Sequence, residues 1–484
     1  MAGVVVTAQA QAAPNSAAQA LPGQVFMVGL AERGDTTKPI KISSLAEAQS
    51  LLGNRVTYGS LYDQLQTFFA EGGKQAYVAR VVGASSTSGS LTLSDRAGSP
   101  VATLKVDAAN PGSWSTNITV EVKNGGLPNT FRMIVTLAGV VVHDFNNISS
   151  PSEAVQRFNG SPYVNVSNLG SATSSPNNNP AVVAATNASG GNDQRGSVSA
   201  TDYVTALARF SPDLGTGAVC IPGQGNATVW QGLITHAEVN NRIALLANPI
   251  ASSVTDYTST ADDYSSPSAG MFGPWVIIPD GAGGSRTISP EGYVAAARAR
   301  AIDQIGPWRV PAGSLSRANF IQGLEVVYSD NDMNTLEAGN VSPIRFVAGS
   351  VRLYGWASLS TDDTNWQYLK ERDLLNWMIY ETERRLEDYT FETVDAKGRL
   401  MADIKGALTA MCEPIATAGG LYQNINHATG EVVDPGYVVI IDGTVNTPQT
   451  LSQNRVNAEL KVRVSPTAGL ITIQITKTGL LQSF

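Results

Sequence analysis

The chain has 484 residues, of which 43% are hydrophobic and only 15% are charged, a composition typical of a packed globular protein and not of a disordered one. Its net charge of −8 and the absence of a basic cluster with interleaved aromatics disfavour nucleic-acid binding through phosphate neutralisation. The two cysteines, Cys220 and Cys412, cannot form a disulfide framework and indicate a reducing compartment.

Residues 1–22 are rich in Ala and Gln and show little periodicity, so we expect an extended N-terminal arm. Its one apolar patch is Val4, Val5 and Val6. The arm has neither the basic start nor the apolar core of a secretory signal, and no run in the chain approaches the roughly 20 apolar residues of a membrane span. We therefore expect the protein to be made in the cytoplasm.

A folded domain is expected to begin after Pro22-Gly23. The run QVFMVGLAERG predicts a buried strand, and SSLAEAQSLLG predicts a helix with Ser43 or Ser44 as its cap and Gly53 as its end. A second helix around SLYDQLQTFFAEGG leads into a strand within QAYVARVV. This order of strand, helix, helix and strand indicates an α/β domain.

The composition changes at residues 84–199, where Ser, Thr, Asn and Gly become frequent. Short alternating runs such as SLTLS, ITVEV and FRMIVTLAGVVV are separated by turn residues, which predicts an inserted all-β domain. Helices and strands alternate again from residue 200. Residues 23–83 and 200–445 are therefore expected to form one α/β core that the insert interrupts.

Helix signals are most complete in the run from Ser289 to Gly306. Ser289 is the expected cap, Pro290 takes the first helical position, and Gly306-Pro307 ends the helix, whose apolar residues are expected on one face. Two long helices should follow. The first is indicated by the helical spacing of Leu374, Trp377, Met378 and Leu386, and the second ends at the pair Gly419-Gly420.

Residues 446–484 are expected to form a C-terminal arm with two half-buried strands. Hydrophobic residues alternate with polar ones in both strands, at Leu460, Val462 and Val464 and then at Ile471, Ile473 and Ile475. A strand so close to the end of the sequence is expected at the edge of a sheet, where its unpaired backbone groups must be covered. Either the same chain or a neighbouring copy must supply the cover.

The residues that catalysis or metal binding would need are scarce. The three histidines, His143, His236 and His427, lie in different predicted elements, and neither a G-x-S-x-G elbow nor an H-E-x-x-H pair occurs. The run DNDMNT starts like a calcium loop but has Thr335 and Val341 where that loop needs Gly and Glu. The sequence therefore predicts no catalytic, cofactor-binding or metal site.

The stretch GYVAAARARAIDQIGPWRVPAG resembles the signature of contractile tail sheath proteins, which form the tails of myophages and related contractile injection systems. The stretches LPGQVFMVGLAERGD, NVSPIRFVAGSVRLYGW and NTPQTLSQNRVNAELKVRVSP resemble other blocks of that family, in the same order. The most specific residues of the resemblance are Gly306, Pro307, Trp308, Pro311, Ala312 and Gly313.

The resemblance implies a structural protein of the virion tail, not an enzyme. It implies a core of subtilisin-like fold and a six-fold helical homopolymer around a tail tube protein, bounded by baseplate and tail terminator proteins. That sheath contracts to drive the tube through the host envelope, and the subunit itself touches neither nucleic acid nor membrane. Arms would cross to neighbouring subunits and complete a sheet there by strand addition. The matching residues are Val4, Val5, Val6, Leu460, Val462, Val464, Ile471, Ile473 and Ile475.

Three alternatives remain at this point. The terminal strands could fold back onto their own subunit. A serine hydrolase of subtilisin-like fold would need His236 beside a serine and an aspartate. A glycan-binding surface protein would owe its function to the insert at 84–199, which otherwise adds only bulk. The sequence leaves open whether the particle is a phage or a phage-derived device.

Overall fold

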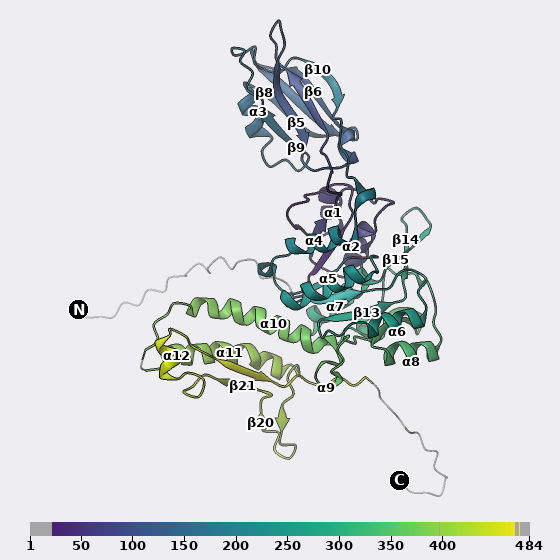
Figure 1. The fold of residues 1–484 in the computed structure, drawn as a ribbon, viewed down its shortest axis with the longest axis vertical. Helices are drawn as coiled ribbons and strands as arrows, with labels where there is room; N and C mark the ends of the chain where they lie inside the picture. Colours follow the sequence, from purple (N-terminus) through teal and green to yellow (C-terminus); the bar gives the residue numbers. More distant parts are fainter. Residues whose placement is uncertain (1–21, 396, 470–473, 475–484) are drawn as a thin grey trace, which may run out of the picture.

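The computed structural model describes residues 22–395, 397–469 and 474. The expected strand residues Val4, Val5, Val6, Ile471, Ile473 and Ile475 lie outside this range. The described chain forms three bodies in a row, with the β-rich insert at one end, an α/β core in the middle and a C-terminal lobe at the other end (Figure 1).

The core contains an eight-stranded sheet in the order β18-β17-β13-β12-β11-β1-β3-β2. Its central strands are parallel, and an antiparallel strand closes each edge. The strands are β1 (Val25–Gly29), β2 (Ile40–Ile42), β3 (Ala76–Arg80), β11 (Ala218–Cys220), β12 (Ile243–Leu246), β13 (Ala269–Gly273), β17 (Val341–Val347) and β18 (Ser350–Leu353). All five residues of β1 are buried, as the sequence predicts for this strand.

Helices cover both faces of this sheet and bury a separate apolar cluster on each. One face carries α1 (Leu45–Leu52), α2 (Leu61–Ala70) and α7 (Glu291–Gln304). The other carries α4 (Ala200–Ala206), α5 (Ala227–Val239), α6 (Val254–Asp262) and α8 (Asp330–Ala338). The core is therefore a layered α/β structure, as expected, and a further small sheet of β14 (Val276–Pro279), β15 (Ser285–Ile288) and β16 (Gly323–Leu324) lies beside it.

Two helix ends test the expected caps. Ser44 caps α1 by accepting from the backbone N–H of Glu47, and Gly53 follows the helix at a φ of 89°, so this prediction is confirmed. The prediction for α7 is wrong in two respects. Pro290 is the N-cap, whereas the Ser289 hydroxyl accepts from Gln64 Nε2, and α7 is buried almost all round instead of on one face.

The insert folds as two antiparallel sheets around its own apolar core. Their orders are β10-β6-β7-β8 and β4-β5-β9. The strands are β4 (Ser90–Ser94), β5 (Ala102–Ala108), β6 (Ile118–Asn124), β7 (Phe131–Leu137), β8 (Val140–Ile148), β9 (Val164–Asn168) and β10 (Val183–Asn187). The expectation of an all-β insert is incomplete, because the helix α3 (Pro151–Arg157) packs within it, capped by the Ser150 side chain.

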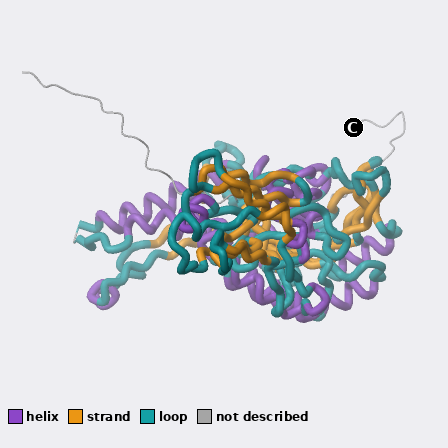
Figure 2. Tube along the Cα trace, turned by 90° about the horizontal axis from the view of Figure 1, so that it is seen from above, coloured by secondary structure: helices purple, strands orange, loops and turns teal. Residues whose placement is uncertain are grey.

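The C-terminal lobe is built on two long helices, α10 (Leu369–Leu386) and α11 (Arg399–Thr417), which follow the short helix α9 (Asp363–Trp366). The strands β21 (Tyr437–Ile440) and β22 (Glu459–Val462) pack on these helices. The hairpin of β19 (Asn424–Ile425) and β20 (Val432–Asp434) extends away from them, and the helix α12 (Pro448–Ser452) lies at the outer end of the lobe. Figure 2 shows the lobe projecting sideways from the rest of the molecule. The predicted helical residues Leu374 and Met378 are buried in the apolar cluster of this lobe, as expected.

Candidate functional site

The candidate site is the two-stranded sheet of β21 and β22 in the C-terminal lobe. Its strands run antiparallel, with Tyr437 opposite Val462 and Val439 opposite Leu460. The side chains of these four residues pack on the apolar cluster that α10 and α11 share. The alternate residues of β22, Glu459 and Lys461, are exposed. One face of the sheet is thus fixed by the helices, and the period-two pattern of the sequence comes from that burial.

Both edges of this sheet lack a strand partner within the described residues. Arg463 N donates to Gly436 O, which turns the backbone groups of Arg463 toward β21. Because alternate residues of an antiparallel strand turn their backbone groups to the same side, Leu460, Val462 and Val464 direct theirs to the outer edge. Unpaired edges of this kind are templates for strand addition.

The expected role of Leu460, Val462 and Val464 between subunits stays a prediction, because the structure describes a single chain. These residues were expected in a strand that crosses to a neighbouring subunit, but β22 pairs with β21 of its own chain. The physical reason is that their side chains fill the apolar cluster of their own lobe. Within this chain β22 therefore pairs with β21, and its outer edge has no strand partner among the described residues.

The chain that follows β22 is fastened to the lobe before the described part ends. Ser465 N donates to Gly420 O at 3.1 Å, and Tyr422 N donates to Arg463 O at 2.7 Å. The buried Lys370 ammonium at the start of α10 donates to Ser465 O. Residues beyond this point therefore start from a fixed position beside the open sheet.

The residues of the family motif connect the core to the lobe. Gly306 follows α7 at a φ of 142°, and its Cα lies against the ring of Trp308. Trp308 packs on the apolar cluster of the lobe, and its ring also closely approaches Gly420 beyond α11. Gly313, at a φ of 71°, begins a short turn after Pro311 and Ala312. The motif thus places a tryptophan of the core segment inside the C-terminal lobe.

His236, which the hydrolase alternative requires, lies beside an amide and a guanidinium group. His236 contacts Asn240 and Arg242, with 2.8 Å between its Nε2 and Arg242 Nη1. Burial, together with the Arg242 guanidinium, lowers the pKa of His236 to about 4. The Ser and Asp partners that the hydrolase alternative requires are thus replaced by an amide and a cation. His143 Nε2 lies 2.7 Å from Ser161 Oγ among aromatic rings of the insert.

The place where an open α/β sheet commonly binds ligands is nearly filled in this chain. At the carboxyl ends of β1 and β11, a cavity of about 30 Å³ is lined by Gly29, Tyr58 and Pro222. Nearby, Glu291 is fully buried and accepts from Gly223 N, and burial raises its pKa to about 7. No cluster of three or more potential metal ligands occurs among the described residues. None of the described helices has the length and apolar character of a membrane span.

No family model matches the sequence, and no curated protein matches it. Solved structures do. A sheath tail protein of Listeria innocua aligns at a TM-score of 0.65 and 14% identity, over 87% of this chain and 89% of that protein. The sheath complex of an extracellular contractile injection system, PVC, in its contracted state aligns at a TM-score of 0.59 and 13% identity, over 98% of this chain and 99% of that one. A sheath tail protein of Desulfitobacterium hafniense aligns at a TM-score of 0.56 and 14% identity, over 90% of this chain and 93% of that protein. The chain therefore has the fold of contractile sheath proteins.

Proposed function

We propose that the protein is the structural subunit of a contractile sheath, which polymerises around a tail tube and shortens when the tail is triggered. The observation that carries this proposal is the extent of the shared fold, which includes the core, the insert and the C-terminal lobe and covers 98% of the chain in one comparison. A mechanical subunit needs no reaction centre, and the surroundings of His236 and the nearly filled crevice agree with such a role.

The open sheet of the lobe supplies a means of polymerisation. Arms of neighbouring copies add to the outer edges of β21 and β22, and the apolar runs at Val4, Val5 and Val6 and at Ile471, Ile473 and Ile475 are the donated strands. Each added strand forms main-chain hydrogen bonds with the edge and buries its alternate side chains. Because the described sheet has two free edges, one subunit can accept an arm at each and link to more than one neighbour.

An order-of-magnitude estimate indicates how many links the assembly needs. Five backbone bonds at roughly 0.5–1.5 kcal/mol each and three buried isoleucines at roughly 1.5–3 kcal/mol each give about 7–16 kcal/mol per arm. Association costs on the order of 4–15 kcal/mol. One arm alone is thus close to break-even, whereas several arms in a helical array hold each subunit firmly.

The remaining parts of the proposal are supported by the likeness to sheath proteins. The polymer is a six-fold helical array of this chain, its inner partner is a tail tube protein, and baseplate and tail terminator proteins bound its ends. The subunit is assembled in the bacterial cytoplasm and is carried in the tail of the particle. The insert, which Figure 1 places at the far end of the molecule from the lobe, would decorate the outer surface.

Electron microscopy of the purified, overexpressed chain tests the proposal. We expect hollow, striated tubes or stacked rings with six-fold symmetry in end views. Deleting residues 1–20, or residues 466–484, should leave a folded monomer that no longer forms tubes. Tubes that form as readily from the deleted chains as from the intact one would contradict strand exchange, and a chain that never polymerises with or without a tube partner would contradict the sheath function itself.

A further inference from the structure

A groove separates the α/β core from the outer half of α10. Its volume is about 530 Å³. One wall is the short turn η4 (Pro212–Leu214) of the core. The other wall is the C-terminal half of α10 with the turn η6 (Glu387–Tyr389). The lining residues that matter below are Pro212, Asp213, Tyr380, Glu383, Leu386 and Glu387.

The N-terminal arm starts beside this groove. The described chain begins at Pro22, and two residues later Gln24 is buried at the start of β1. Gln24 Nε2 donates to Leu214 O at 2.6 Å and to Thr216 O at 2.9 Å, and Gln24 O accepts from Ala218 N at 3.1 Å. Leu214 directly follows Asp213 of the groove wall. The root of the arm is thus bonded to the same loop that forms one side of the groove.

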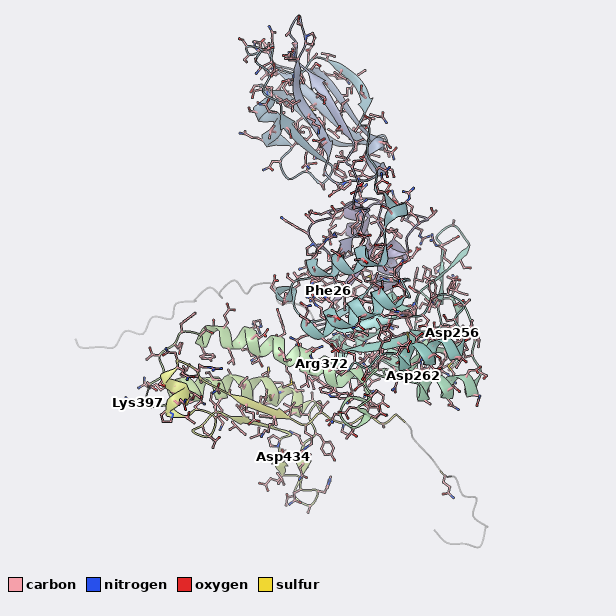
Figure 3. The ribbon with its side chains drawn as sticks, viewed as in Figure 1. Phe26, Asp256, Asp262, Arg372, Lys397 and Asp434 are labelled. Carbon is pink, nitrogen blue, oxygen red and sulfur yellow. The ribbon has the colours of Figure 1, made fainter. Side chains whose placement is uncertain are left out.

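Helix α10 lies against the amino end of β12, an interior strand of the core sheet. Asn376 Nδ2 donates to Arg242 O at 3.3 Å, and Arg372 Nη2 donates to Asn241 Oδ1 at 3.3 Å, both just before β12. Figure 3 shows Arg372 at this junction, below Phe26 of β1. The start of β1 lies at this same end of the sheet, because Val25 pairs with Ala218 and Ala218 pairs with Ile243. The groove therefore lies at the end of the sheet where the described chain begins.

We propose that residues 12–21 of the same chain lie in this groove. Their sequence, AAPNSAAQAL, is uncharged. Small alanine side chains suit contact with Pro212, Tyr380 and Leu386, and the amide groups of Asn15 and Gln19 can donate to the acceptor-rich walls at Asp213, Glu383 and Glu387. Ten residues span at most about 33 Å. Tethering at Gln24 makes the docking intramolecular, which favours this segment over the same segment of a second copy.

This inference is independent of the sheath function, because docking of residues 12–21 needs no neighbour. It does set what the remaining arm can do. Only residues 1–11, with a reach of about 36 Å, would leave the groove. The patch at Val4, Val5 and Val6 would then start from a defined point on the lobe instead of from the edge of the core.

Cross-linking with isotope labels tests the occupant. Gln19→Cys is combined with Glu387→Cys in the full chain, and a short bismaleimide reagent joins thiols that lie close together. The native Cys220 and Cys412 are buried and stay unreactive. The control pair combines Gln19→Cys with Asp262→Cys, on α6 at the opposite side of the molecule from the outer end of α10 (Figures 1 and 3). Chains with ordinary and heavy nitrogen are mixed, treated and analysed as peptides.

We expect 19–387 links that carry one isotope label only, well above the control pair. Mixed-label links would show that a second copy fills the groove and would overturn the proposal, as would 19–387 links no more frequent than the control. Hydrogen exchange provides a second readout without substitutions. Deleting residues 1–21 should speed exchange of the amides at 386–390 by about tenfold or more, whereas deleting residues 1–11 should not. Equal exchange in all three chains would also overturn the proposal.

Discussion

The eight-stranded sheet of the core and the two-stranded sheet of the C-terminal lobe differ in how their edges are covered. The core sheet closes one edge with the three-residue strand β2 and covers the other, where Ala318 N donates to Val351 O of β18. The lobe sheet leaves both edges of β21 and β22 without partners among the described residues. One chain therefore contains a sheet whose edges are short or covered and a sheet with two longer edges that have no strand partner among the described residues, and we propose that the second sheet serves assembly.

The largest effect should come from a proline on the open edge. Val462→Pro removes an N–H that faces outward, so tubes should be lost while the monomer loses no more than about 1–2 kcal/mol of unfolding free energy. Lys461→Pro is the control, because its N–H faces β21, and replacing it removes a ladder hydrogen bond and should destabilise the monomer more than Val462→Pro does. Electron microscopy and urea unfolding measure the two effects. If Val462→Pro forms tubes normally, the edge is not used in assembly.

The next largest effect should come from the junction between core and lobe. Arg298 of α7 and Asp373 of α10 form a buried bidentate pair, with distances of 2.7 and 2.6 Å and side chains only 2% and 3% exposed. Asp373→Asn leaves a buried guanidinium without its carboxylate and should lower the unfolding free energy by about 3–5 kcal/mol. Urea unfolding measures this loss.

The exposed pair Lys74 and Asp303 is the matched control for that substitution. Asp303→Asn should change stability by less than about 1 kcal/mol, because exposed ion pairs are screened by water. A similar small change for Asp373→Asn would mean that the lobe is not locked to the core through this pair.

Lowering the pH should reduce the unfolding free energy of the core, where His236 lies. His236 has a pKa of about 4 in the folded core and about 6.5 when unfolded, so the unfolded chain binds more protons between these values. Its contribution is complete above pH 6.5 and is lost as the pH falls toward 4, by about 3 kcal/mol in total. In His236→Gln the slope of stability against pH should be shallower in that window. An unchanged slope would show that the histidine does not stay neutral beside Arg242.

The smallest effect should appear inside the lobe. A methyl group on Gly420 would lie 2.6 Å from Trp308 Cδ2 and from Ile415 Cγ2, so Gly420→Ala should cost about 1–3 kcal/mol through overpacking. Gly406, in the middle of α11, has open space around it, and Gly406→Ala should stabilise by roughly 0.5–1 kcal/mol. Thermal unfolding of both variants measures the contrast. Equal shifts would mean that the Trp308 contact is looser than described.

Much of the core could be predicted because its signals are local. The apolar run of β1 and the Ser44 and Gly53 ends of α1 require no knowledge of distant residues. The central strand β13 was missed because its sequence, AGMFG, has two glycines and no β-branched residue. Glycine is needed at both positions because residues distant in the sequence pack closely against them. A Cβ on Gly270 would lie 2.6 Å from Leu369 Cδ1, and one on Gly273 would meet Tyr257.

The candidate site could be predicted only in part. The alternating residues of β22 indicated a half-buried strand, and the structure places Leu460 and Val462 in one. Its pairing with β21 could not be read from the pattern, because period-two alternation specifies which face is buried and not which strand lies alongside. The helix α12 was also missed, since Asn446-Thr447-Pro448 reads as a loop although Thr447 caps the helix and Pro448 starts it.

The insert meets the core through two segments that are joined to each other. Gly83 N donates to Asp193 O at 2.9 Å, so the entering and leaving chains lie side by side. Between them, the insert has its own apolar centre. An insert attached in this way can be deleted and its two ends in the core joined by a short turn. It can also be replaced by another compact domain whose ends are equally close. In the proposed sheath, such exchanges would place chosen cargo at the density of the subunits while leaving the body of each subunit unaltered.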